Sequence, residues 1–244
     1  MFKKNIYDNK TKNPFKISRT KIDLFFDCKR CFFLDQKFGI RRPHGTPLVI
    51  NNKIINNFKQ ELKECREQKK VHPKILKLNR NFIPLNSTKL FEWSNSFKGV
   101  RHLHKESNFL LYGIIDDIWY DSHNKKNHLV IIKTTSKDDT LNHNSIWPGY
   151  WRQLSFYSFL VQKNGIDTSK TGIFIYINTG KNSKDFSNVN ISFNIDIFEK
   201  ILDFSWIETT IVEIYQMLNN SKIPEKSHNC KFCKYYFNIK QIDE

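Results

Sequence analysis

The sequence contains no alanine, and glycine and proline are scarce, with 8 and 7 residues among 244. Lysine, asparagine and isoleucine are abundant instead, which is the skew expected from a very AT-rich genome. Acidic residues are also in deficit, since 24 Asp and Glu face 40 Lys and Arg, for a formal net charge of +16. Clustered Lys and Arg displace counterions from phosphates, so this charge favours a nucleic-acid partner. The same AT-rich skew raises the number of lysines at surface positions without a specific function. The net charge alone therefore does not identify the binding partner.

Long apolar runs are missing as well. No stretch of eighteen consecutive apolar residues is present, which excludes a membrane-spanning helix. The first residues, MFKKNIYDNKTKN, are charged and lack the apolar stretch of a signal peptide. We therefore expect a cytoplasmic protein, in which five cysteines act as metal ligands or buried residues rather than in disulfides.

Local patterns predict a single mixed α/β domain over residues 17–238, preceded by a flexible segment, 1–16. Residues 70–87 are expected to be irregular. Apolar residues at helical spacing predict helices over 18–38, 50–69, 88–103, 147–163 and 203–219. Segments rich in β-branched and aromatic residues predict strands over 108–120, 128–135, 172–178 and 189–197. This order of helices, strand hairpin, helix, strands and helix suits a mixed β-sheet flanked by helices.

The predicted hairpin brings an acid and a lysine together. With its turn centred near Asn124, Asp116 lies opposite residues 131–133, and alternation puts residues 131 and 133 on one face. An Asp that faces such a lysine is the skeleton of a metal-dependent phosphodiesterase. Carboxylates there hold Mg²⁺, the metal activates water, and the lysine orients that water. The alternative without a function is that Asp116 and Asp117 are a solvent-exposed pair on a strand and that Lys133 is an ordinary surface lysine.

In these residues the chain resembles the PD-(D/E)XK nuclease superfamily, in particular its RecB/AddB-like and CRISPR-associated exonuclease branch. Gly113 to Asp116 is similar to the G-x-x-D element of that branch, and residues 131–134, IIKT, stand in the place of its D-x-K-T element. The pair Gln153 and Tyr157 is similar to its Q-x-x-x-Y signature, and SRTKIDLFFDCKRCFFL (18–34) resembles the helix that carries its first cluster cysteine.

The resemblance covers residues 17–237 and implies a restriction-endonuclease-like fold that acts on DNA, of unknown strandedness. It implies Mg²⁺-dependent phosphodiester hydrolysis, with Asp116 as a metal ligand and Lys133 positioning water. It also implies that Gln153 and Tyr157 support the active site and contact DNA. We expect Arg152 and lysines to gather around the cleft between the hairpin and the 147–163 helix.

One position departs from the family pattern. Residue 131, where the family has a metal-binding Asp or Glu, is Ile, which cannot bind Mg²⁺. The helix over 50–69 offers no acid before Glu61, so the remaining candidates are Asp117, which regular alternation turns to the opposite face, and the loop acids Asp138 and Asp139. Two hypotheses follow: a nuclease that another acid completes, or an inactive DNA-binding module with the same fold.

Two CxxC pairs stand near the two ends of the sequence. Cys28 and Cys31 lie on a predicted helix, where they share a face, and Cys230 and Cys233 lie in the tail. Four thiolates suit a tetrahedral Zn²⁺ ion or a [4Fe–4S] iron–sulfur cluster. The resemblance implies an iron–sulfur cluster that closes both ends of the domain, but its members place one cysteine first and three last, so the cluster type stays open. Two unrelated buried pairs are the plain alternative, as is a structural protein with a zinc staple. Cys65 is expected to be an ordinary helix residue.

Overall fold

The computed structural model describes residues 5–43, 49–136, 141–178 and 193–243, and it is of the mixed α/β class that the sequence predicts. The chain divides into two compact units, each assembled from separate stretches of sequence. Unit 1 contains Met1–Thr46, Arg101–Tyr112 and Ser205–Glu244, and unit 2 contains Pro47–Val100 and Gly113–Phe204. Within the described ranges, no helix has both the length and the apolar character needed to cross a bilayer.

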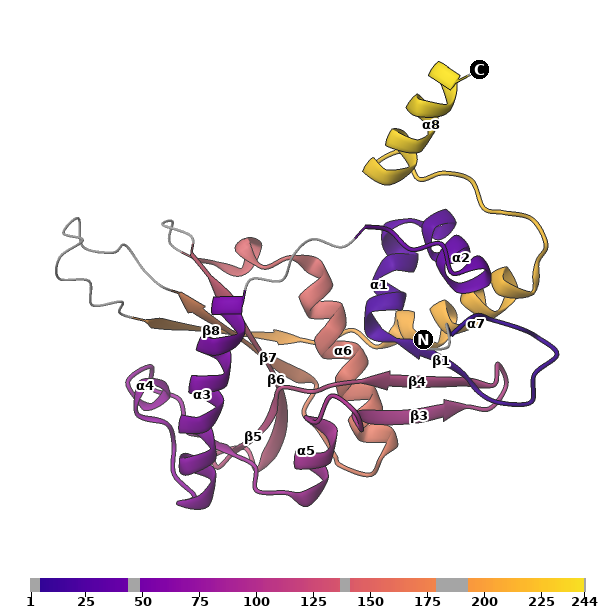
Figure 1. The fold of residues 1–244 in the computed structure, drawn as a ribbon. Helices are drawn as coiled ribbons and strands as arrows, with labels where there is room; N and C mark the ends of the chain where they lie inside the picture. Colours follow the sequence, from indigo (N-terminus) through magenta and orange to yellow (C-terminus); the bar gives the residue numbers. More distant parts are fainter. Residues whose placement is uncertain (1–4, 44–48, 137–140, 179–192, 244) are drawn as a thin grey trace. The chain divides into compact units, whose positions relative to one another are not determined.

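Unit 2 is built on a five-stranded mixed sheet with the order β2-β5-β6-β7-β8 (Figure 1). Its strands are β2 (Phe82–Pro84), β5 (Asp117–Asp121), β6 (Lys126–Thr135), β7 (Thr171–Asn178) and β8 (Asn194–Ile201). The β5–β6 pair is the predicted antiparallel hairpin, in which Asp117 pairs with Val130. Strands β6 and β7 are parallel and are joined through helix α6 (Pro148–Lys163), as a parallel pair requires a crossover.

Helices cover this sheet because its strands are apolar on both faces. Helix α3 (Val49–Glu67) packs Phe58 and Leu62 against one face, together with Val130, Ile132, Ile173 and Ile175 of the central strands. Helix α6 packs on β6 and β7, where the rings of Tyr150 and Trp151 lie 5.3 and 5.8 Å from that of Phe174. The short helices α4 (Pro73–Leu76) and α5 (Thr88–Trp93) and the 3₁₀ turn η1 (His143–Ser145) also belong to unit 2.

The described residues of unit 1 form four helices and a three-stranded sheet with the order β1-β4-β3, whose end residues Val100 and Gly113 are assigned to unit 2. Its elements are β1 (Phe15–Ser18), α1 (Arg19–Asp27), α2 (Lys29–Phe38), β3 (Val100–His104), β4 (Phe109–Gly113), α7 (Ser205–Asn219) and α8 (Lys231–Asp243). Strands β1 and β4 are parallel. Phe15 and Lys16 therefore belong to a strand, although the sequence placed them in the flexible segment.

Several predicted boundaries are wrong for local reasons. The helix expected over 18–38 ends at Gly39, as predicted, but is broken at Cys28, whose backbone is extended. The helix expected over 88–103 ends at Trp93, and Gly99, with a φ of 62°, leads into β3. Strand β2 and helix α4 lie in the segment expected to be irregular, and the cysteine-bearing tail contains α8. Residues 189–192 of the last predicted strand lie outside the described residues.

Candidate metal centre and nuclease-like hairpin

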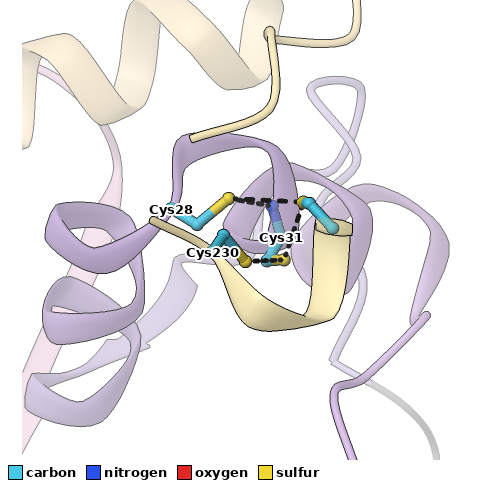
Figure 2. Close-up of side chains that lie close together, drawn as sticks. Cys28, Cys31 and Cys230 are labelled. Carbon is cyan, nitrogen blue, oxygen red and sulfur yellow. Dashed lines mark hydrogen bonds between the residues drawn. The ribbon is translucent and has the colours of Figure 1, made fainter. Parts of the chain in front are cut away.

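The four paired cysteines converge in unit 1, as the sequence predicts. Cys28 and Cys31 stand at the start of α2, whereas Cys230 and Cys233 stand at the start of α8, and all four are buried. Their sulfur atoms all lie within 4.8 Å of one another. The Sγ atom of Cys31 lies 3.6 Å from that of Cys230, and Cys233 Sγ lies 3.7 Å from both Cys28 Sγ and Cys31 Sγ. Figure 2 shows the side chains of Cys28, Cys31 and Cys230 pointing toward one another.

The break between α1 and α2 positions the first pair. The sequence predicted Cys28 on the face of a helix. In the structure it is instead the N-cap of α2, with φ −161° and ψ 108°. Its sulfur accepts a hydrogen bond from the backbone N–H of Cys31 at 3.5 Å. An N-cap side chain commonly accepts from the first turn of its helix, so the cap brings the two sulfurs to the same end of α2.

The electrostatics of the cluster favour a bound cation. Burial works to raise the pKa of Cys28, but the backbone N–H groups of Cys31 and Ser227 and the neighbouring thiols lower it to about 7. Burial raises the pKa of Cys31 to about 11 and also raises that of Cys233. The thiols of Cys31 and Cys233 therefore resist ionising, and a divalent cation removes this resistance by stabilising the thiolates. The donor set fits a metal.

Arg42 adds a positive charge beside the sulfurs. Its Nη2 donates to Cys230 Sγ at 3.1 Å, and its Nη1 donates to the carboxylate of Asp27. The guanidinium also lies 4.8 Å from the ring centroid of Phe232 on α8. Donors outside a metal's own ligands orient them and tune the site. The sequence alone does not indicate this residue, because nothing in the segment RRPHGTP points to cysteines so far along the chain.

The hairpin in unit 2 brings Asp116 beside residues 131–133, as the sequence predicts. Asp116 precedes β5, and its Oδ2 accepts from the backbone N–H of Ile132 at 3.1 Å. Its Oδ1 accepts from the Nζ of Lys59 at 2.7 Å. Continuing the β5–β6 register by one residue puts Asp116 opposite Ile131, which is fully buried. Lys59 belongs to α3, the helix that offers no acid before Glu61.

The other acids near the hairpin do not supply a second ligand among the described residues. One carboxylate oxygen of Asp117 accepts from Arg66 Nη2 at 2.6 Å and from the Ile118 N–H at 2.8 Å, and the other from Trp119 Nε1 at 3.2 Å. Asp138 and Asp139 lie outside the described residues. In the part of the chain that the structure describes, the four cysteines are the one cluster of His, Cys, Asp and Glu side chains able to hold a metal. Within the described residues, no second free carboxylate lies beside Asp116.

Of the three remaining predicted site residues, Gln153 and Tyr157 lie on α6 and Lys133 lies beside it. The Nζ of Lys133 lies 5.5 Å from the ring centroid of Tyr150. Gln153 is buried, and its Oε1 has no hydrogen-bond partner among the described atoms. Tyr157 is buried, and its ring packs against Gly113. The G-x-x-D and Q-x-x-x-Y elements are therefore in contact.

No protein-family model and no curated protein matches this sequence. The cysteine cluster has a complete and buried donor set for one metal centre, whereas the carboxylate of the hairpin is already bound to a lysine. The expected crowding of lysines around the hairpin stays a prediction.

Proposed function

We propose that Cys28, Cys31, Cys230 and Cys233 bind one Zn²⁺ ion in a structural site. Zn–S bonds of about 2.3 Å in a tetrahedron separate the sulfurs by about 3.8 Å. The shorter sulfur distances here, 3.6 and 3.7 Å, agree with that spacing. In a [4Fe–4S] cluster each thiolate binds a different iron, so the sulfurs stand farther apart. Four protein ligands also leave no open position for a substrate, which favours a structural role.

Metal analysis tests the zinc proposal. Protein purified without added metal is expected to be colourless. Elemental analysis by inductively coupled plasma mass spectrometry should find one zinc ion per chain. A brown protein with iron, acid-labile sulfide and broad visible absorption would contradict the zinc proposal. An iron–sulfur cluster would then occupy the same four cysteines.

We propose, further, that the protein binds DNA through a nuclease-like fold without hydrolysing it. The observation that carries this proposal is the ion pair between Lys59 and Asp116. The ammonium of Lys59 stands at the carboxylate that Mg²⁺ would need, and the buried Ile131 stands where a second carboxylate is expected. Mg²⁺ is usually held by one or two carboxylates together with phosphate oxygens and waters. A carboxylate that is already paired with an ammonium group is a poor ligand for Mg²⁺.

Charge and aromatic groups near α6 support the DNA-binding half of the proposal. The formal net charge is +16. Three cations lie over aromatic rings of α6 and its N-cap: Lys133 over Tyr150, Arg152 over Trp147 and Lys200 over Trp151, at 5.5, 5.8 and 5.5 Å. Cations neutralise phosphates, and an exposed ring accepts a stacked base; of these three rings Trp147 is exposed, Tyr150 is partly buried and Trp151 is buried.

A paired binding and cleavage assay tests the function. Fluorescent single- and double-stranded DNA of one sequence is titrated with protein at several salt concentrations. Affinity is expected to fall steeply with salt, as phosphate neutralisation requires. Lys133→Gln with Arg152→Gln is expected to weaken binding more than the control Lys10→Gln with Lys12→Gln, on two exposed residues of unit 1. Cleavage with Mg²⁺ or Mn²⁺ should be absent. Robust cleavage that Asp116→Ala abolishes would overturn the non-catalytic proposal, and salt-insensitive or absent binding would overturn the DNA proposal.

A further inference from the structure

Among the described helices of unit 1, α8 has the largest share of exposed side chains. Among its described side chains only Cys233 is buried, and Phe237 is partly buried against the cysteine cluster. Five large side chains are exposed, including Tyr235 at 71%, Tyr236 at 55% and Ile242 at 84%; the others are Phe232 and Ile239. A helix of 13 residues is marginal in water unless something packs against it. A binding partner that packs against the exposed face would therefore stabilise the helix.

The exposed residues form one stripe, which we call the α8 stripe: Phe232, Tyr235, Tyr236, Ile239 and Ile242. Their spacing of three and four residues places them along one side of the helix, away from Cys233 and Phe237. Lysines border the stripe. Lys231 lies on one edge and Lys240 on the other, with Lys234 farther around, and the one acid of the helix is its last residue, Asp243. The stripe thus combines aromatic rings with positive charge.

We infer that the α8 stripe binds single-stranded nucleic acid, and this inference rests on the proposed DNA-binding function. The charge of the helix decides between possible occupants. A second copy of this chain would bring three lysines of one α8 against three of the other, within a protein of net charge +16. A single strand instead offers phosphates to the lysines and unpaired bases to Phe232, Tyr235 and Tyr236. Every base has a face that stacks on an aromatic ring, so such binding tolerates different sequences.

Arg42 connects the stripe to the metal centre. The guanidinium that donates to Cys230 Sγ also lies over the ring of Phe232, the first residue of the stripe. The two cysteines at the start of α8 bring the helix to the cluster. The orientation of the stripe therefore depends on the four-cysteine site, which gives that site a role in binding as well as in stability.

The test compares variants of the stripe on two probes, a fluorescent oligo(dT) and a blunt DNA duplex of equal length. Tyr235→Ala with Tyr236→Ala is expected to weaken oligo(dT) binding at least about tenfold, since each aromatic side chain stacks one base. Replacing Lys231, Lys234 and Lys240 by Gln is expected to reduce the slope of log affinity against log salt by about 2, for three phosphate contacts to a single strand. Duplex binding should change by less than about twofold in the tyrosine variant.

Matched controls separate this inference from general effects of composition. Phe97→Ala removes an aromatic side chain that is 88% exposed, and replacing the exposed residues Lys10, Lys12 and Lys105 by Gln removes the same charge. Both controls should bind oligo(dT) like the unmodified protein, and all variants should keep their metal content and far-UV circular dichroism. Unchanged oligo(dT) affinity in the tyrosine variant would overturn the inference while leaving DNA binding intact. Failure of the unmodified protein to bind either probe would overturn the proposed function itself. A dimer in sedimentation that the tyrosine variant dissociates would identify the stripe as a self-association surface and would also overturn it.

Discussion

The ring of Tyr157 packs against Gly113 so closely that a β-carbon on Gly113 would lie 2.2 Å from Cε1 of the ring. The glycine is needed for space, because any side chain there collides with a buried aromatic ring at the end of β4. Gly113→Ala is therefore expected to destabilise the protein by about 1–3 kcal/mol, as overpacking a core does. Chemical denaturation measures this cost. The same change in a Tyr157→Ala background should cost much less, and an equal cost in both backgrounds would show that the ring is not the cause.

The four-cysteine centre should stabilise unit 1. Cys233→Ser is expected to lower metal content and to destabilise the protein by several kcal/mol, because a structural zinc ion supplies about 10–16 kcal/mol of binding free energy in small zinc domains. Helix α8 should lose helicity with the metal, since it is short and mostly exposed. Metal analysis and circular dichroism during titration with a chelator check both effects. Cys65→Ser, at a buried cysteine of α3 outside the cluster, is the control and should keep the metal.

Arg42 should tune the metal centre without being a ligand. Arg42→Ala removes the donor to Cys230 Sγ and is expected to lower zinc affinity by about 10- to 100-fold, as the loss of a hydrogen-bond partner of a metal ligand does. Competition with a chromogenic chelator measures the affinity. The neighbouring Arg41, whose charged group lies 3.6 Å from Asp35 and not at a sulfur, is the control. Equal losses in Arg41→Ala and Arg42→Ala would point to a general charge effect.

The buried pair of Arg66 and Asp117 should be structural. Both side chains are almost fully buried, and the carboxylate accepts from the guanidinium at 2.6 Å. Burial raises the pKa of Asp117, and the charge of Arg66 together with the Ile118 and Trp119 donors opposes that rise. Arg66→Leu is expected to cost about 3–5 kcal/mol, because it leaves a buried carboxylate without its cation. The more exposed pair of Arg80 and Glu199 is the control, and Arg80→Ala should cost less than about 1 kcal/mol in the same denaturation experiment.

Restoring the missing acid should require removing the lysine. Ile131→Asp alone is expected to destabilise the protein by several kcal/mol, because it buries an unpaired carboxylate. This single variant should bind Mg²⁺ poorly, since the ammonium of Lys59 is still paired with the carboxylate of Asp116. Ile131→Asp with Lys59→Ala frees two carboxylates and is expected to bind Mg²⁺ measurably by calorimetry. Mg²⁺ binding by Ile131→Asp alone, as tight as in the double variant, would contradict the role given to Lys59.

The hairpin and crossover helix were predictable because their signals are local. Strands β5 and β6 are rich in β-branched and aromatic residues and flank a polar turn, and α6 ends at Asn164 and Gly165, as expected. Strand β2 was missed because its three residues are too few to show a period. Helix α8 was missed because one buried cysteine and a mostly exposed surface do not give the amphipathic pattern of a core helix.

By itself the sequence determined the presence of two CxxC pairs, an Asp and a Lys on facing strands, and an Ile in place of the second acid. These are facts of composition and short spacing, and strand alternation is enough to place the Asp, the Lys and the Ile on one hairpin. Only the tertiary structure decided that the four sulfurs share one site, that Lys59 takes the carboxylate of Asp116, and that Arg42 joins Cys230 to Phe232. Each of these contacts joins residues from different elements of the chain, and no local pattern specifies which charged side chain will reach a given partner across a folded core.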